Sequence, residues 1–223
     1  MRDFKYIDLK ECILKDNDGV AEEIRKLAND KNIFVWNLMS SPGAGKTTFI
    51  IRLLKRLSQD IKIGVIEGDV ESTLDAEKIH AFNIPTVQLR TGGSCHLDAA
   101  MIKKAMDYLP LDELDVVIVE NIGNLVCPAE FDIGADLQSM ILSVPEGDDK
   151  AIKYPLMFSV CKALIVTKID TLPCFDFDFE ALEKNVRKLN HQIKIFPLSA
   201  KTGEGVEDFI TFLMHEINSK IKR

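Results

Sequence analysis

The chain has 223 residues, which fits one α/β domain with a large core, or such a domain plus a short appendage. Its formal net charge of −7 argues against binding to nucleic acid or to an anionic membrane, because both need a basic protein surface. The chain has no apolar run as long as a membrane span, and its five cysteines show no dense disulfide spacing, so we expect a cytoplasmic protein.

Strand-like and helix-like segments alternate along the chain. Residues 1–32 precede the first strand and contain a helical pattern, which predicts a helical N-terminal extension ahead of one domain at 33–223. Near-continuous Val and Ile runs, such as residues 116–119, are typical of strands covered on both faces. The predicted fold is therefore α/β, with a mostly parallel sheet and helices on both of its faces. We expect strands at 33–39, 61–67, 84–89, 115–120, 139–144, 163–167 and 193–197, and helices near 19–30, 46–58, 75–81, 94–108, 178–189 and 205–219.

The segment 40–48 reads Ser-Ser-Pro-Gly-Ala-Gly-Lys-Thr-Thr and lies between the first strand and an amphipathic helical pattern. This is the setting of a phosphate-binding loop (P-loop), in which backbone N–H groups and a helix N-terminus hold phosphates. Lys46 can reach the β- and γ-phosphates and the Thr47 hydroxyl can ligate Mg²⁺, although Ser40 replaces the first Gly of the general pattern. We expect a nucleoside triphosphate with Mg²⁺ to bind to Gly43, Ala44, Gly45, Lys46, Thr47 and Thr48.

Two later segments favour guanine as the base of that nucleotide. In Thr167-Lys168-Ile169-Asp170, the carboxylate of Asp170 can accept from both N1–H and the N2 amine of guanine, a pair that adenine does not offer. Lys168 would lie along the base, and Thr167 replaces a usual Asn with only part of its hydrogen bonding. The backbone of Ser199-Ala200-Lys201 suits the guanine O6. The order of these segments behind a phosphate loop predicts GTP binding and a P-loop GTPase domain (G domain) at residues 33–223.

Mg²⁺ and the attacking water need oxygen ligands from the strand ends beside the phosphate loop. Asp69 follows the second strand and Glu120 ends the fourth, so both are candidates for the outer, second shell of groups around Mg²⁺. Glu120 and Gly123 stand where a loop that senses the γ-phosphate would begin.

The segment 71–79 is polar first and then helical, which is typical of a mobile switch. Asp75 within it either orients the hydrolytic water or caps the helix that it opens. The candidate catalytic residues are therefore Lys46, Asp75 and Glu120.

Cys95 and His96 are predicted to open the helix at 94–108, and Cys127 follows the fourth strand. Thiolate and imidazole suit Zn²⁺ or Ni²⁺, and a helix N-terminus lowers the pKa of a thiol toward the thiolate that binds. Three ligands leave a four-coordinate ion incomplete, so a water or a second copy of the chain must complete it. Spacing alone favours another interpretation, in which the cysteines are small core residues and His96 merely starts a helix.

The combination of motifs adds to this argument. The segments are Ser-Ser-Pro-Gly-Ala-Gly-Lys-Thr-Thr (40–48), Glu-Gly-Asp (67–69), Asp-Ala-x-Lys-Ile (75–79), Thr-Gly-Gly-x-Cys-His-Leu-Asp (91–98), Glu-Asn-Ile-Gly-Asn-Leu-Val-Cys-Pro (120–128), Ser-Val-x-Glu-Gly-x-Asp-Lys (143–150) and Lys-Tyr-Pro-x-Met-Phe (153–158). Together they resemble the HypB family, the GTPases that help to insert nickel into nickel–iron hydrogenase.

The resemblance implies that Cys95, His96 and Cys127 bind nickel or zinc in the G domain. It also implies a GTP-hydrolysing metallochaperone that couples its nucleotide state to nickel delivery during hydrogenase maturation. The expected partners are a second copy of the chain, in a nucleotide- or metal-dependent homodimer, the hydrogenase large subunit and other nickel-insertion accessory proteins.

The loop at 120–127 suggests how the two sites communicate, because it runs from the γ-phosphate sensor to a metal ligand. Loss of the γ-phosphate would relax this loop and move Cys127 relative to Cys95 and His96. The main alternative function is a regulatory GTPase switch that holds no metal. A P-loop kinase is disfavoured by the guanine-type segment at 167–170.

Overall fold

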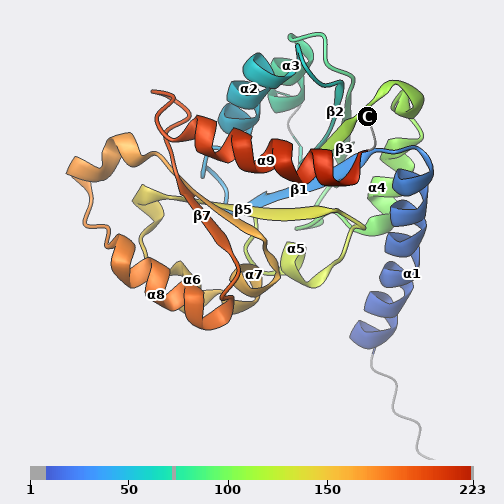
Figure 1. Cartoon of the computed structure of the whole chain (residues 1–223). Helices are drawn as coiled ribbons and strands as arrows, with labels where there is room; N and C mark the ends of the chain where they lie inside the picture. Colours follow the sequence, from blue (N-terminus) through green and yellow to red (C-terminus); the bar gives the residue numbers. More distant parts are fainter. Residues whose placement is uncertain (1–8, 72–73, 222–223) are drawn as a thin grey trace, which may run out of the picture.

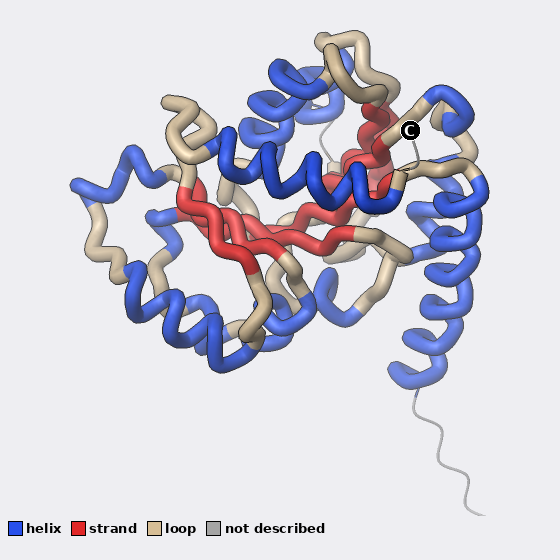
Figure 2. The backbone as a smooth tube through the Cα atoms, in the orientation of Figure 1, coloured by secondary structure: helices blue, strands red, loops and turns tan. Residues whose placement is uncertain are grey.

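The computed structural model describes residues 9–71 and 74–221, and in this part of the chain seven parallel strands form one sheet between layers of helices (Figures 1 and 2). The strands lie in the order β3-β2-β4-β1-β5-β6-β7. Their bounds are β1 (Phe34–Ser40), β2 (Ile63–Asp69), β3 (Thr86–Arg90), β4 (Val116–Glu120), β5 (Leu137–Ser143), β6 (Ala163–Thr167) and β7 (Lys194–Pro197). The predicted fold class is confirmed.

The helices follow the alternation expected from the sequence. The longer ones are α1 (Leu9–Asp30), α2 (Lys46–Leu57), α3 (Leu74–His80), α4 (Ala99–Met106), α8 (Phe179–Leu189) and α9 (Val206–Lys220). Three short helices were not predicted: α5 (Cys127–Glu130), α6 (Lys150–Lys153) and α7 (Pro155–Val160). The 3₁₀ turns are η1 (Leu111–Glu113), η2 (Val144–Glu146) and η3 (Ile169–Cys174).

Both faces of the sheet are covered, so every residue of the central strand β1 is buried. Because side chains alternate between the faces of a strand, Trp36 packs on one face among residues of α2 and α9. Val35 points to the other face and joins a cluster with residues of α1 and α4. Farther along the second face, α7 and α8 cover β5 and β6. This two-sided burial explains the near-continuous apolar runs of the strands.

The position of β1 sets the place of the site. β1 is flanked by β4 on one side and β5 on the other, each in parallel register. The loop after β1 therefore opens onto the crevice at the carboxyl ends of the strands where the strand order reverses, which is where such sheets bind ligands.

The N-terminal helix α1 begins at Leu9, ten residues earlier than the predicted pattern at 19–30. Its residues Ala21, Ile24 and Ala28 are buried and belong to the same cluster as Val35 and Val117 of the sheet. α1 is therefore part of the packed core beside α4 (Figure 1). Residues 1–8 of the predicted extension lie outside the described residues.

One predicted helix boundary is wrong in a way that matters for the site. The helix expected at 94–108 begins at Ala99, and Asp98 caps it by accepting a hydrogen bond from the Met101 N–H at 2.8 Å. Asp is a preferred N-cap residue, whereas Cys and His are not. Cys95 and His96 therefore lie in a loop ahead of the helix.

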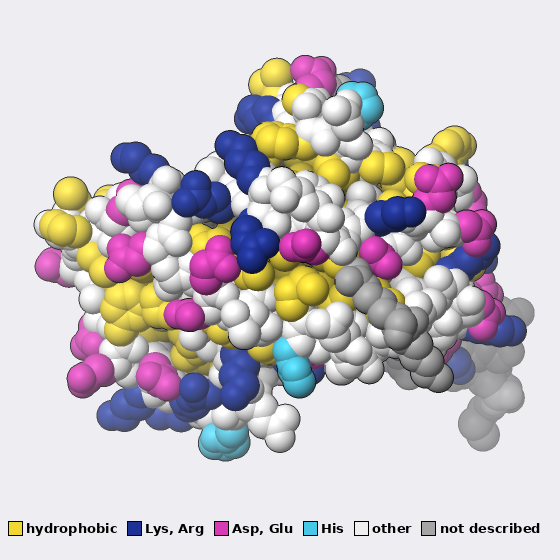
Figure 3. All heavy atoms as spheres, turned by 45° about the horizontal axis from the view of Figure 1, so that its top comes forward, with side chains coloured by type: hydrophobic (Ala, Val, Ile, Leu, Met, Phe, Trp, Pro, Cys, Tyr) yellow, Lys and Arg dark blue, Asp and Glu magenta, His cyan; other side chains and the backbone are white. Residues whose placement is uncertain are grey.

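On the face of the molecule drawn in Figure 3, acidic and basic side chains are interspersed with apolar ones. Across residues 9–71 and 74–221, no helix is both long enough and apolar enough to cross a membrane.

Candidate functional site

The phosphate loop occupies the turn between β1 and α2, as predicted. Gly43 and Gly45 have φ values of +74° and +100°, a left-handed region that residues with a side chain rarely adopt. Gly45 is the N-cap of α2, so the free N–H groups of the first helical turn face the crevice. A cavity of about 490 Å³ lies in front of this turn.

Ser40, which departs from the general motif, has a local role. It is the last residue of β1 and is fully buried, and its hydroxyl accepts a hydrogen bond from Lys46 Nζ at 2.9 Å. Burial lowers the pKa of Lys46, while the nearby Glu120 and Glu67 oppose this shift. The serine thus supplies a polar partner for a lysine that is largely removed from water.

The loop is also anchored by Glu146, a residue that was quoted in a motif but given no role. Its carboxylate accepts from the Ser143 N–H at 2.8 Å and from the Ser143 hydroxyl at 2.6 Å. Its other oxygen accepts from the Ser41 hydroxyl. Glu146 therefore ties the phosphate loop to the end of β5.

Three carboxylates converge beside the phosphate loop: Glu67, Asp75 and Glu120 have oxygen atoms within 4.8 Å of one another. Glu67 and Glu120 are adjacent because β2 and β4 place them opposite each other in parallel register. Burial raises the pKa of Glu67 to about 8, with a further contribution from Glu120. Burial raises the pKa of Glu120 to about 7, against the opposing effect of Lys46. The arrangement crowds carboxyl groups where little water reaches them, so ionising Glu67 or Glu120 costs free energy unless a cation is bound.

This cluster fits a hard divalent cation such as Mg²⁺, which prefers oxygen ligands. Glu67 Oε2 and Glu120 Oε2 are buried and have no hydrogen-bond partner, so a cation would satisfy both. Thr47, the predicted Mg²⁺ ligand, donates its hydroxyl to Glu120 Oε1 at 2.8 Å. Asp69 lines the same cavity and accepts from the Glu71 N–H at 2.8 Å.

Glu67 is the member of this cluster that sequence reasoning missed. The predicted strand 61–67 ends at Glu67 and the predicted ligand was Asp69, two residues later, but β2 continues to Asp69. One signal was available in the sequence: Glu67 is an acidic residue in an otherwise apolar strand, and a second strand also ends in an acidic residue, Glu120.

Asp75 lies inside the first turn of α3, where it forms an ion pair with Lys78 at 2.7 Å. The interpretation of Asp75 as a cap is not supported, because α3 already begins at Leu74. Part of the predicted switch, residues 72–73, lies outside the described residues.

Gly123 is placed against the phosphate loop, as its expected role requires. A Cβ atom at this position would lie 2.8 Å from the Pro42 backbone nitrogen and 2.9 Å from the Pro42 Cα. Only glycine allows the loop after β4 to come this close to the phosphate loop.

The residues predicted to bind the base surround a second cavity of about 290 Å³, which shares Gly45 and Thr48 with the phosphate cavity. Its lining comprises Ala44, Gly45, Thr48, Thr167, Lys168, Asp170, Thr171, Ser199, Ala200 and Lys201. The structure thus brings together all the residues selected from the two guanine-type segments.

Hydrogen bonds hold this second cavity in shape. The Thr167 hydroxyl donates to the Ala44 carbonyl at 2.8 Å, and Lys168 Nζ donates to the Gly43 carbonyl at 2.8 Å. Ser199, which is fully buried, donates to Asp170 Oδ1 at 2.6 Å. The Thr167 hydroxyl thereby fixes the phosphate loop. This role was not predicted when Thr167 was considered as a replacement for the usual Asn.

Cys95, His96 and Cys127 also converge, with ligand atoms within 4.8 Å of one another. The two Sγ atoms are 3.0 Å apart, and Cys95 Sγ lies 3.8 Å from His96 Nδ1. Cys95 is exposed, and the other two residues are partly exposed. Cys161 is buried and Cys174 is exposed, and neither belongs to this cluster; the side chain of Cys12 lies outside the described residues.

The expected position of the Cys95 thiol at a helix N-terminus is wrong, because α4 begins at Ala99. Cys95 precedes α4 by several residues, and the pKa of Cys127 is raised by the hydrogen bond between the thiols and by desolvation. Burial lowers the pKa of His96, whose ring stacks on Phe131 with 3.9 Å between centroids. Burial therefore favours the neutral form of the imidazole, which is the form that binds a metal.

Asn121, for which no role was predicted, connects the end of β4 to the Cys95–His96 loop. It follows Glu120 and is fully buried, and its Oδ1 accepts from the Leu97 N–H at 3.0 Å and from the Ile122 N–H at 2.9 Å. Leu97 follows His96 and also packs on the second strand, since a Cβ at Gly68 would lie 2.7 Å from Leu97 Cδ1. The loop that carries Cys95 and His96 is therefore fixed to the carboxyl ends of the strands. Cys95, His96 and Cys127 form what we call the thiol–imidazole cluster.

Comparison with known proteins identifies the family. Residues 34–197 match the family model described as CobW/HypB/UreG, nucleotide-binding domain. The hydrogenase maturation factor HypB of Escherichia coli strain K12 is 41% identical over 209 residues, which cover 94% of this chain and 72% of that protein. The chain belongs to the HypB family.

Solved HypB structures share the same fold. HypB from Helicobacter pylori in complex with nickel is 38% identical and superposes with a TM-score of 0.88 over 93% of this chain and 98% of that one. HypB from Archaeoglobus fulgidus is 34% identical, with a TM-score of 0.86 over 92% of this chain and all of the other. The family resemblance found in the motifs is confirmed.

The first prediction concerns Glu67. Because burial raises the pKa of Glu67 to about 8, this carboxyl costs unfolding free energy at neutral pH, and Glu67→Gln should stabilise the metal-free protein by about 1–3 kcal/mol at pH 7. Stabilisation by Mg²⁺ should fall in the same variant, because an amide cannot ionise to give an anionic oxygen ligand. Thermal unfolding with and without Mg²⁺, in the presence of GDP, measures both effects.

Glu71→Gln is the matched control, since Glu71 is exposed and lies outside the carboxylate cluster. It should respond to Mg²⁺ as the wild type does. Equal Mg²⁺ stabilisation of the Glu67→Gln variant and the wild type would contradict the assignment.

Proposed function

We propose that this chain is a GTP-hydrolysing metallochaperone that binds nickel, or zinc, and couples its nucleotide state to nickel delivery during hydrogenase maturation. The observation that carries the proposal is the convergence of Cys95, His96 and Cys127 on a loop fixed to the nucleotide crevice. Membership of the HypB family supports it, because a relative is a hydrogenase maturation factor and another was solved with nickel.

GTP is the proposed substrate. The contiguous cavities accommodate the phosphates at Gly43–Thr48 and a base beside Asp170. Asp170 Oδ1 is occupied by the Ser199 hydroxyl, which orients the carboxylate that would accept from guanine. Ala200 and Lys201 would offer backbone N–H groups to the guanine O6.

Hydrolysis would use the residues around the phosphate cavity. Lys46 would neutralise charge on the β- and γ-phosphates, and the N–H of Gly123 would face the γ-phosphate from the loop after β4. Glu120 and Asp75 would position the attacking water or the ligands of the cation. Mg²⁺, held through Thr47 and the carboxylates, would compensate the negative charge of the phosphates.

Nickel is the proposed cargo, bound by two thiolates and an imidazole. These ligand types also suit Zn²⁺, so the same site would accept either ion. The three ligands would be completed by a water or by a second copy of the chain. A homodimer with a two-fold axis near the loops would bring two such sets together, and nucleotide or metal binding would then favour dimerisation.

The proposed coupling runs through Asn121 and Leu97. A shift of the loop after Glu120 on loss of the γ-phosphate would be passed through the Asn121 amide to Leu97 and so to His96. Because coupling between two binding sites is reciprocal, bound metal would change nucleotide affinity by the same factor. Delivery to the hydrogenase large subunit and to other nickel-insertion accessory proteins would follow this change in affinity. The thiol ligands must stay reduced, which fits the cytoplasm.

The second prediction tests nucleotide choice. Asp170→Asn should weaken GTP binding and improve binding of xanthosine triphosphate, because an amide can donate to the C2 oxygen of xanthine. The loss for GTP should be about 1.5–3 kcal/mol for each hydrogen bond to the charged carboxylate. Competition titrations with the two nucleotides measure it. Unchanged GTP affinity would place the base elsewhere.

The third prediction tests the function itself. Cys95→Ala, His96→Ala and Cys127→Ala should each abolish tight Ni²⁺ or Zn²⁺ binding at this site while GTP binding persists. Cys161→Ala and Cys174→Ala are the matched controls and should bind metal normally. Metal titration with light scattering on the same samples gives both the affinity and the number of chains per ion. Retention of wild-type affinity in any one of the three ligand variants would favour a regulatory GTPase without a metal function.

A further inference from the structure

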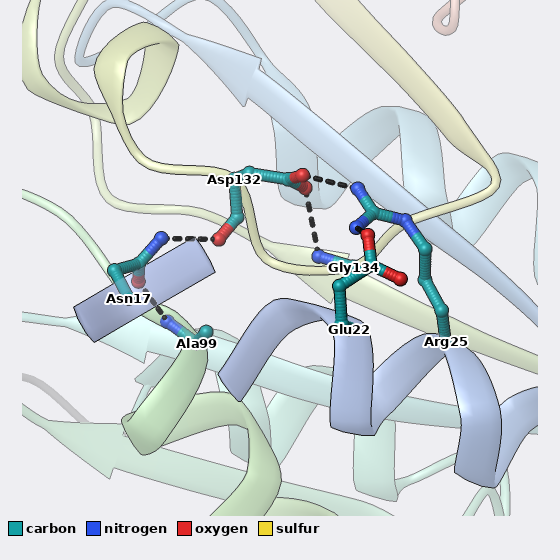
Figure 4. Close-up of polar contacts among 6 residues, drawn as sticks. All are labelled: Asn17, Glu22, Arg25, Ala99, Asp132 and Gly134. Atoms are coloured by element: carbon teal, nitrogen blue, oxygen red, sulfur yellow. Dashed lines mark hydrogen bonds and ion pairs between the residues drawn. The ribbon is translucent and has the colours of Figure 1, made fainter. Parts of the chain in front are cut away.

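Asn17 of α1 joins the start of α4 to the segment that follows α5 (Figure 4). Its Oδ1 accepts a hydrogen bond from the Ala99 N–H at 2.9 Å, and its Nδ2 donates to the Asp132 carbonyl at 2.7 Å. The partners are far away in sequence, so one side chain joins the N-terminal helix, the start of α4 and the segment after α5.

Each of these two contacts lies close to a metal ligand. Ala99 begins α4, three residues after His96. Asp132 follows Phe131, the residue whose ring stacks on the His96 imidazole, and the short helix α5 between Cys127 and Glu130 leads directly to it. Asn17 therefore joins the two segments that lead to the cluster, whereas Asn121 holds the Leu97 N–H.

The burial of Asn17 makes its two hydrogen bonds costly to lose. Its exposed fraction is only 8%, so neither amide group would be fully satisfied by water if its partner moved away. The Ala99 N–H belongs to the first turn of α4 and has no partner within the helix, so the Asn17 oxygen completes the N-terminus that Asp98 caps.

The segment after α5 is seated on α1 by further contacts. Gly134 has a φ of +73°, and a Cβ there would lie 2.5 Å from the Ala21 carbonyl oxygen, so only glycine permits this close approach. The Asp132 side chain accepts from the Gly134 N–H at 2.9 Å and pairs with Arg25 of α1. Figure 4 shows Asn17 and Arg25 contacting this segment from one helix.

We propose that Asn17 is a positioning residue for the metal site: it holds the Cys95–His96 loop and the Cys127–Phe131 segment at one fixed separation, so that α1 controls how well the three ligands fit an ion. The inference rests on the proposed metal function of Cys95, His96 and Cys127. It assigns to the N-terminal helix a part in metal binding although none of the described side chains of α1 belongs to the cluster.

The test compares two variants of Asn17 that differ in one group. Asn17→Ala loses both hydrogen bonds. Asn17→Asp keeps an acceptor for the Ala99 N–H but cannot donate to the Asp132 carbonyl, so it completes α4 without bridging the loops. Ni²⁺ titration of the full chain, followed by thiolate-to-nickel charge-transfer absorption, reports both affinity and ligand geometry.

Both variants should bind Ni²⁺ about 10- to 100-fold more weakly, the usual effect of removing a group that orients metal ligands, and with an altered absorption band. GDP binding measured without metal should stay unchanged, because it reports a folded G domain. Arg25→Ala is the matched control: it removes a partly exposed ion pair between α1 and the same segment but leaves the Asn17 bridge intact, and it should bind Ni²⁺ normally.

Three outcomes would overturn the proposal while leaving the proposed function in place: wild-type metal binding in Asn17→Ala, full recovery in Asn17→Asp, or an equal loss in Arg25→Ala. The second would mean that Asn17 only completes a helix terminus, and the third that any anchor of the segment has the same effect. If Cys95→Ala binds Ni²⁺ as the wild type does, the metal site itself is refuted and this inference falls with it.

Discussion

The buried amide of Asn121 is the contact on which the arrangement of the two sites depends. The amide lies one residue beyond Glu120 and uses its oxygen to hold the Leu97 and Ile122 N–H groups, while its nitrogen donates to Asn37 Oδ1 at 3.2 Å. Water cannot take the place of these hydrogen bonds, because Asn121 is fully buried. A movement of the strand end must therefore move the Cys95–His96 loop or break hydrogen bonds at a cost of about 1–3 kcal/mol for each group left unsatisfied. This cost is of the same size as a typical allosteric coupling energy.

The acidic residues of the phosphate cavity lie next to the Asn121 contact in the chain, since Glu120 precedes Asn121. Glu67 and Glu120 lie side by side on the adjacent strands β2 and β4, and burial raises the pKa of each. Each carboxyl group has one buried oxygen without a hydrogen-bond partner. Buried carboxyl groups that serve only stability are normally hydrogen-bonded or paired with a cation. The two unpartnered oxygens therefore point to a ligand that supplies positive charge. Occupation of the phosphate cavity and ordering of the strand ends would then occur together. Asn121 directly follows Glu120, the carboxyl group that would contact the bound cation.

The sequence was sufficient for the fold and for most of the site because the relevant signals are local. The apolar runs located all seven strands, and the residues chosen for the phosphate and base cavities do line them. Glu67, Asn121 and Asn17 were missed because their roles depend on strand register or on contacts between distant segments, which periodicity does not encode. The start of the helix predicted at 94–108 was also wrong, because the capping side chain is Asp98 and the helix begins at Ala99.

The most direct test of this account is the ratio of Ni²⁺ affinities measured with a slowly hydrolysed GTP analogue and with GDP. In the wild type the two affinities should differ by about 5- to 150-fold, the usual range of allosteric coupling. In Asn121→Ala, which deletes the amide that joins Glu120 to Leu97, the two affinities should become equal even if both change. A ratio in Asn121→Ala that matches the wild-type ratio would contradict the account, because the two sites would then communicate without this contact.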